Sequence, residues 1–189
     1  MSGRQLRTVV ADTSALVSLA VPRAGAAVGT DAPDPFQYLL TSCEVLVPPE
    51  VVAELRDVTQ YQDVHAAAAN NVLAARGHYT VEDPYEREDA PDSRPTFGLD
   101  DGETDGIVLA NALDVDGFLT DEFGGTNFPL IHAVLQGPRI VPTPRLIVDY
   151  ARIGHLSHDA ARTLITTISP HRSWENSPYV SQLLHQLDE

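Results

Sequence analysis

The stretch TVVADTSALVSLA, residues 8–20, is the segment from which the fold can first be inferred. Its β-branched run predicts a short buried strand over residues 7–11. The next three residues, Asp-Thr-Ser, favour the start of a helix, and the apolar residues 15–21 predict that helix. A strand that passes directly into a helix is typical of an α/β protein.

The same alternation continues along the rest of the chain. Further strands are predicted over residues 44–47, 78–81, 117–120 and 139–141. Helices are predicted over residues 36–40, 49–75, 100–113, 129–135, from 144 onward, 158–168 and 178–187. Short apolar strands separated by helices indicate a parallel sheet that is covered on both faces. In such sheets the ligand crevice lies beyond the carboxyl ends of the strands.

The length of 189 residues suits one compact domain. We predict a main domain over residues 1–145 and a helical C-terminal extension, residues 146–189, packed on the same domain. No stretch approaches the roughly 20 apolar residues that span a bilayer, and the N-terminus does not have the pattern of a signal peptide. Cys43 is the single cysteine, which excludes an internal disulfide. We therefore expect a cytoplasmic protein that does not contact a membrane.

The charge of the chain is strongly acidic. Twelve Lys and Arg residues against 27 Asp and Glu residues give a net charge of −15, and the sequence contains no lysine. Such a surface repels nucleic acid, because polyanion binding normally rests on Lys and Arg. A salt-adapted protein is the other interpretation, since at 1 M salt the Debye length shrinks to about 3 Å and screens the repulsion. We favour this interpretation because the acidic residues are spread along the chain.

Four carboxylates are expected to meet at the carboxyl edge of the sheet. Asp12 and Asp121 each follow a predicted strand directly, and Glu54 lies about one helical turn after the second strand. Glu103 lies near the start of the helix that leads into the fourth strand. We choose Glu103 rather than Asp105 because small and apolar residues share its helical face. The topology therefore predicts an acidic cluster.

Such a cluster favours a hard divalent cation. Carboxylates that converge without basic neighbours repel one another and keep protons above their ordinary pKa. Mg²⁺ and Mn²⁺ remove this conflict, since they prefer oxygen ligands, and they can activate water for phosphodiester hydrolysis. Each acid also has a structural alternative: Asp12 can cap a helix, Glu103 can complement a helix dipole, Glu54 can lie on an exposed helix face, and Asp121 can start a loop.

Four segments, in order and spacing, resemble the PIN-domain nucleases: VVADTSALVSLA, VLVPPEVVAEL, LDDGETDGIVLANALDVDGFLTDE and RIVPTPRLIVDYARIGHLS. They are most similar to the archaeal and bacterial branch that includes toxin–antitoxin ribonucleases. The most specific pieces are DTSAL, the Gly102-Glu103 pair followed by Ala110, and LTD with its following acid. The resemblance implies a three-layer α/β/α sandwich with a central parallel sheet of four to five strands and a helical C-terminal tail. It also implies Mg²⁺ or Mn²⁺ as cofactor and single-stranded RNA as substrate.

The resemblance assigns metal binding and catalysis to Asp12, Glu54, Glu103 and Asp121. Ser14 is expected to orient Asp12 or a water on the metal. Glu122 stands where the family often has a second Asp, and Asn127 lies in the segment where the family commonly has a basic residue. Candidates to hold a phosphate backbone are Arg23, Arg56 and Arg145.

The sequence thus predicts a metal-dependent endoribonuclease, with the toxin of a toxin–antitoxin pair as one form of it. A small antitoxin protein and a homodimer formed through the tail helices are partners that the sequence leaves open. The alternative function is a PIN-like binding or regulatory module without catalysis. A signalling receiver domain also places Asp residues at strand ends, but it needs a lysine that this chain lacks.

Overall fold

The computed structural model describes residues 5–25, 31–123 and 125–188. Five strands form one sheet, all parallel, in the order β3-β2-β1-β4-β5: β1 Thr8–Ala11, β2 Glu44–Val47, β3 Thr80–Val81, β4 Gly117–Leu119 and β5 Arg139–Val141. The α-helices are α1 Thr13–Ala20, α2 Pro35–Ser42, α3 Pro49–Val58, α4 Val64–Ala74, α5 Asp101–Leu113, α6 Asn127–Val134, α7 Thr143–Arg152, α8 His158–Arg172 and α9 Pro178–His185. The predicted α/β fold with a central parallel sheet is confirmed.

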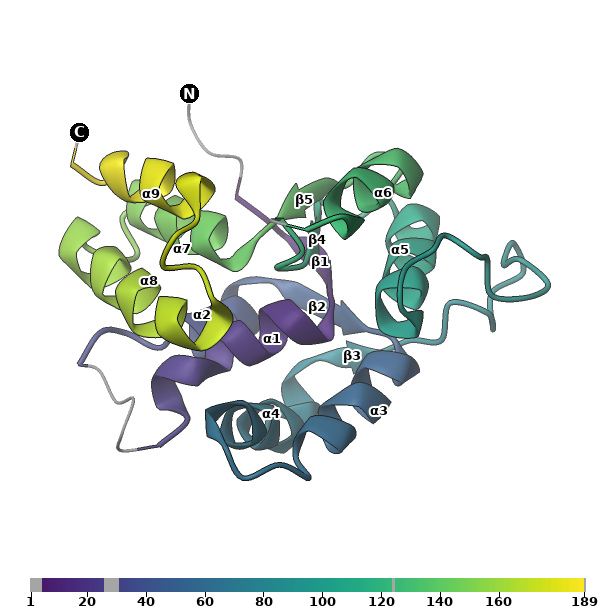
Figure 1. The fold of residues 1–189 in the computed structure, drawn as a ribbon. Helices are drawn as coiled ribbons and strands as arrows, with labels where there is room; N and C mark the ends of the chain where they lie inside the picture. Colours follow the sequence, from purple (N-terminus) through teal and green to yellow (C-terminus); the bar gives the residue numbers. More distant parts are fainter. Residues whose placement is uncertain (1–4, 26–30, 124, 189) are drawn as a thin grey trace.

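Helices cover both faces of the sheet, as Figure 1 shows, with α5 and α6 together on one side and α7, α8 and α9 grouped apart from them. The strands alternate their buried side chains between two cores. Val10, Leu46 and Phe118 pack with α5 and α6, whereas Val9 and Val45 belong to the larger core with the other helices. Because both faces are buried, the strands are apolar after their first residues, which explains their continuous hydrophobic runs.

Helix α3 and helix α4 are separate, so the prediction of one helical stretch over residues 49–75 was wrong. The chain turns over residues 59–63, a polar segment with few groups to bury. Asp63 then begins α4 by accepting a hydrogen bond from Ala66 N at 2.9 Å. Such an N-cap satisfies a backbone donor that a continuous helix would have bonded internally.

Two other bounds differ from the prediction. The third strand is only Thr80–Val81, because the residues before it form a short 3₁₀ turn, Arg76–His78. Helix α8 continues past Ile168 to Arg172, with Pro170 inside it, and ends where Ser173 adopts a left-handed conformation (φ 58°).

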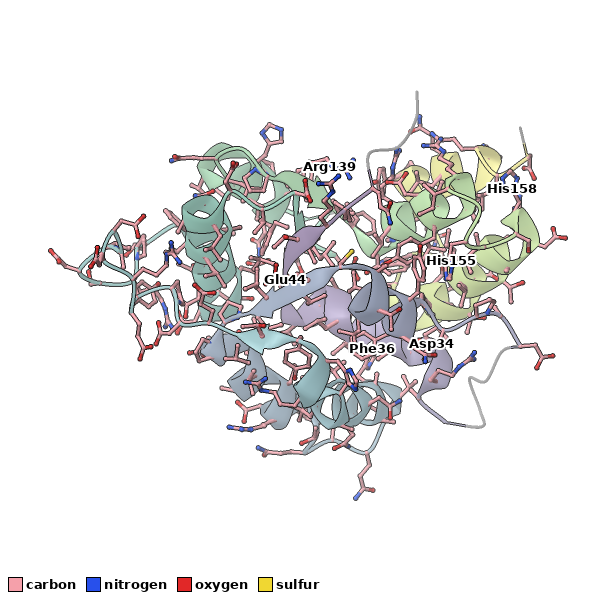
Figure 2. The ribbon with its side chains drawn as sticks, turned by 180° about the vertical axis from the view of Figure 1, so that it is seen from behind. Asp34, Phe36, Glu44, Arg139, His155 and His158 are labelled. Carbon is pink, nitrogen blue, oxygen red and sulfur yellow. The ribbon has the colours of Figure 1, made fainter. Side chains whose placement is uncertain are left out.

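The C-terminal helices share the larger core with the sheet. Leu146, Ile165 and Leu183, one from each of α7, α8 and α9, belong to the same cluster of buried residues as Val9 of β1. The boundary predicted at residues 145/146 falls within α7. Figure 2 shows His155, from the α7–α8 connection, on the same side of the molecule as the start of α2, and its ring stacks on Tyr38 of that helix.

None of the helices in the described part of the chain is long and apolar enough to cross a membrane.

We predict that Gly106→Ala destabilises the fold. A Cβ at Gly106 of α5 would lie 2.7 Å from Cε2 of Phe118, a fully buried ring of β4. Overpacking of this kind costs about 1–3 kcal/mol, more than the gain in helix propensity. Denaturant unfolding measures the free energy of unfolding. Gly77→Ala is the control, because no neighbour lies within 4 Å of its Cβ position. Equal stabilities of the two variants would contradict this packing.

Candidate functional site

The strand order creates a crevice between the ends of β1 and β4. From β1 the chain adds β2 and β3 on one side, and then β4 and β5 on the other. Ligands of open α/β sheets bind beyond the carboxyl ends of the strands at such a switch point. A cavity of about 480 Å³ lies there, lined by Asp12, Thr13, Ser14, Val17, Glu54, Val58, Tyr61, Asp63, His65, Asp100, Glu103, Glu122 and Arg172.

Asp12 lies at the end of β1, at the centre of this crevice. Its backbone N donates to Leu119 O of β4 at 2.9 Å, and its carboxylate caps α1 by accepting from Ser14 N. The side chain is only 3% exposed. Burial raises the pKa of Asp12 to about 7, although hydrogen bonds from Thr120 and Ser14 lower it. Asp12 is therefore both a helix cap and a lining residue of the cavity.

Ser14 joins the ends of the two central strands. Its hydroxyl donates to Asp12 Oδ2 at 3.1 Å and accepts from Asp121 N at 2.9 Å. Ser14 thus orients Asp12 directly, and it holds the backbone that follows β4 at the same edge.

Glu54 reaches the cavity from α3. Thr13 Oγ1 donates to its Oε2, and Gly102 N donates to its Oε1 at 3.0 Å. A Cβ at Gly102 would lie 2.7 Å from Glu54 Cδ, so the glycine is what allows the carboxylate to approach α5. Burial raises the pKa of Glu54, the hydrogen bonds lower it, and the charge of Asp100 raises it further.

Glu103 and Asp121 are the two predicted acids with a buried carboxylate oxygen that has no hydrogen-bond partner among the described residues, and of these two only Glu103 lines the cavity. Glu103 is 3% exposed, and its Oε2 accepts a weak hydrogen bond from Asn127 Nδ2 at 3.3 Å. Its Oε1 is buried with no hydrogen-bond partner among the residues described. Burial raises the pKa of Glu103 to about 8, with further contributions from the charges of Asp100, Asp12 and Glu122. A buried, unsatisfied carboxylate oxygen that lines a cavity is available to accept a hydrogen bond or to bind a cation.

Asp121 lies at the predicted edge, but its carboxylate turns toward α7. Its Oδ1 accepts from Thr143 N, in the first turn of α7, at 2.8 Å. The N-cap of that helix, Pro142, makes no side-chain cap of its own, so Asp121 replaces it. Asp121 does not line the cavity, whereas its neighbour Glu122 does.

Asp100 was not among the acids predicted for the site. It caps α5, since its Oδ1 accepts from Glu103 N at 2.7 Å, and it also lines the cavity. Asp105 is buried elsewhere: Arg94 donates to both its oxygens at 2.8 Å, and Tyr85 Oη donates to it at 2.6 Å. The choice of Glu103 over Asp105 as the residue that faces the crevice agrees with this placement.

The cavity is lined by one arginine, and it is none of those considered from the sequence. Arg172, at the end of α8, lines it. Arg145 instead pairs with Asp149 at 3.0 Å within α7, and Arg23 lines a different cavity, next to α2. Arg56 lies in the last turn of α3 and does not line the cavity either.

The oxygen donors of the cavity suit a hard divalent cation, although no three His, Cys, Asp or Glu side chains in the described ranges are already gathered as a metal centre. Mg²⁺ keeps several waters and needs only one or two direct carboxylate ligands. The unpaired Oε1 of Glu103 and the raised pKa of Asp12 both indicate carboxylates that lack a compensating positive charge. The residues present therefore fit Mg²⁺ or Mn²⁺.

Comparison of the chain with protein-family models, with curated proteins and with solved structures finds no match in any of the three.

We predict that the metal-free protein loses stability as pH rises from about 4 to about 8. In the unfolded chain Asp and Glu titrate near pH 3.9 and 4.3, whereas Asp12 and Glu103 titrate near 7 and 8 in the fold. Across this window the folded state holds more protons, so the free energy of unfolding falls with pH until both groups are ionised.

Unfolding in EDTA at constant salt, at several pH values, measures this slope. Glu103→Gln removes one of the two titrations and should flatten it between pH 5 and 8. Glu44→Gln, at the start of β2 and therefore at the opposite edge of the sheet, is the control. An unchanged slope in Glu103→Gln would show that the carboxyl ionises normally.

Proposed function

We propose that the protein is a Mg²⁺- or Mn²⁺-dependent endoribonuclease that hydrolyses phosphodiester bonds of single-stranded RNA. The observation that carries the proposal is the buried Glu103, with an unpaired oxygen, beside Asp12 in the switch-point cavity. The substrate class rests on the resemblance of four segments of the sequence to the PIN-domain nucleases.

The acids that line the cavity have different roles in the proposed cation site. Asp12 and Glu103 are the direct ligands that we propose, with Glu54, Asp100 and Glu122 as the remaining acids of the cavity. Bound there, the cation supplies Lewis-acid polarisation and neutralises the charge that develops on the phosphodiester. Ser14 and Asn127 orient the two ligands through their hydrogen bonds. Because the acids are partly protonated near neutral pH, cation binding releases protons and strengthens as pH rises.

Asp121 has a supporting part in this proposal. Its Oδ1 accepts from the first turn of α7, its Oδ2 has no hydrogen-bond partner among the described residues, and it precedes Glu122, which lines the cavity. Of the four acids assigned from the sequence, Asp121 is therefore the one that we now place as a positioning residue.

The acidic surface indicates the conditions of the reaction. With a net charge of −15, the protein repels RNA at low ionic strength. High salt screens this repulsion more than it weakens contacts inside a partly enclosed cavity. We propose a salt-adapted enzyme of the cytoplasm. The small antitoxin and the homodimer stay predictions from the sequence.

Cleavage of a mixed, labelled single-stranded RNA pool tests the function. We expect cleavage with Mn²⁺ or Mg²⁺, none with EDTA, and a loss of at least 100-fold in Asp12→Asn and Glu103→Gln, on the order expected when a group that stabilises transition-state charge is removed. Glu44→Gln should cleave like the wild type. The assay should be run at low and at molar salt.

The alternative, a module that binds without catalysis, makes a different prediction in the same assay. Folded wild-type protein that binds Mn²⁺ but cleaves no RNA at any salt concentration would favour the binding module over the enzyme.

Gly102→Ala should reduce the activity of the site without reducing the stability of the fold. The new Cβ displaces the flexible carboxylate of Glu54, while alanine favours helix α5 over glycine by about 0.5–1 kcal/mol. We expect unchanged or slightly higher thermal stability together with at least tenfold slower metal-dependent cleavage. Gly77→Ala, far from the cavity lining, should keep both. Full activity in Gly102→Ala would exclude Glu54 from the reaction.

A further inference from the structure

The residues that line the cavity can be divided by their chemistry into two sets, an acidic half and a mixed half. The acidic half is formed by the carboxylates of Asp12, Glu54, Asp100, Glu103 and Glu122. The mixed half is formed by Val17 and Val58, by the aromatic ring of Tyr61, by the Asp63–His65 pair, and by Arg172. The volume of about 480 Å³ lies within the range of small-ligand pockets, about 300–1,000 Å³. The single carboxylate of the mixed half, Asp63, pairs with His65, and the proposed cation site does not use this half.

Arg172 lines this half, and its positive charge lowers the pKa of Asp121 without a direct ion pair between the two side chains. Within the part of the chain that the structure describes, the guanidinium makes no ion pair, and its Nε is buried without a hydrogen-bond partner. By contrast, Arg145 and Arg162, also in the C-terminal helices, pair with Asp149 and Asp188. A buried donor of a charged group that has no hydrogen-bond partner lowers the stability of the fold, unless a ligand accepts its hydrogen bond.

The backbone around Arg172 is well anchored. His171 O is hydrogen-bonded by His65 Nε2 at 2.8 Å, which ties the end of α8 to the start of α4 across the rim of the cavity. Trp174 N donates to Ser169 O at 3.0 Å, and the Trp174 ring packs 5.7 Å from that of Phe123. The backbone that carries Arg172 is therefore held in place by contacts on both sides, which lowers the entropy cost of binding a ligand.

Tyr61 presents an aromatic ring on the same half. It lies in the turn between α3 and α4, where its N donates to Val58 O at 3.3 Å, and the residue is 69% exposed. A single exposed aromatic residue is ordinary on a protein surface. Here, however, the ring shares a cavity with an arginine whose Nε has no hydrogen-bond partner among the described residues, and this combination of a stacking surface and a cation is typical of sites for single-stranded nucleic acid.

We propose that this half of the cavity is a nucleotide subsite, in which Arg172 holds a phosphate of the RNA and Tyr61 stacks on a base. The inference rests on the proposed function and adds the surface that recognises its substrate. The planar guanidinium suits a phosphate because it can donate two parallel hydrogen bonds. The RNA backbone would then run from the phosphate at Arg172 toward the carboxylates, so that a neighbouring phosphodiester reaches the acidic half. Stacking accepts any base, and the subsite therefore has weak sequence preference.

Fluorescence anisotropy of a labelled single-stranded RNA pentamer tests the subsite without requiring cleavage. Ca²⁺ takes the place of Mg²⁺, since it is also a hard cation with oxygen ligands. Tyr61→Ala should raise the Kd about tenfold, on the order of the loss of one stacked base, and leave the salt dependence unchanged. Arg172→Gln should raise the Kd to a similar degree. It should also reduce the slope of log K against log salt by about 0.7, the value for one phosphate contact on a single strand.

Matched variants separate binding from folding. Tyr61→Phe keeps the ring and should bind like the wild type. Arg172→Lys keeps the charge and should keep the slope, even if it binds more weakly. Arg162→Gln removes an arginine of α8 that pairs with Asp188 outside the cavity, and it should change neither quantity. Circular dichroism over the same salt range confirms that each variant is folded.

The outcomes distinguish this proposal from the nuclease itself. Wild-type binding that Tyr61→Ala and Arg172→Gln leave unchanged would overturn the subsite, even if metal-dependent cleavage is observed. Binding that both variants weaken, in a protein that cleaves nothing, would support the subsite and reject the nuclease. Absence of RNA binding by the wild type at every salt concentration would overturn the subsite.

Discussion

The hydroxyl of Ser14 links the carboxyl ends of β1 and β4, and the geometry of the cavity depends on this link. It donates to Asp12 on one side and accepts from the backbone N of Asp121 on the other. Beyond the end of β1, Asp12 N still donates to Leu119 O of β4, and a contact past this bond has to come from a side chain. The serine supplies that contact at the switch point. Asp12, which follows β1, and Glu122, which follows β4, consequently lie on the same cavity.

The acids of this cavity are held at a cost to the stability of the metal-free protein. Burial raises the pKa of Asp12 and Glu103, so one or both keep a proton near neutral pH. Two buried acids of α5 have different partners. Asp105 forms an ion pair with Arg94, whereas Glu103 accepts a hydrogen bond from the neutral side chain of Asn127. The acid that lies away from the cavity, Asp105, is thus paired with a cation, and the acid that lines the cavity, Glu103, is not.

Much of the architecture follows from patterns that are local in the sequence. The apolar strands, the caps at Asp12 and Asp100, and the helical face that turns Glu103 inward all depend on neighbours a few residues away. The break between α3 and α4 was not predicted, because the alanine-rich residues that follow favour helix so strongly that a short polar turn did not appear to interrupt it. The orientation of Asp121 was also not predicted, since it depends on the free N-terminus of α7, which begins 22 residues later.

Patterns along the sequence indicate which residues form strands and helices, and they predict Asp12, Glu54 and Glu103 at one edge of a parallel sheet. Both follow because hydrophobic periodicity and the alternation of strands with helices can be recognised without knowledge of distant contacts. Which other groups line the cavity with them depends on contacts between segments far apart in the chain. Arg172 and Tyr61 are separated by more than one hundred positions, and neither belongs to a sequence pattern that indicates a ligand. They line one cavity because α8 packs back on the main body of the fold and His65 bonds the backbone at its end. The C-terminal helices pack because they bury apolar surface. This packing places Arg172 in the same cavity as Tyr61.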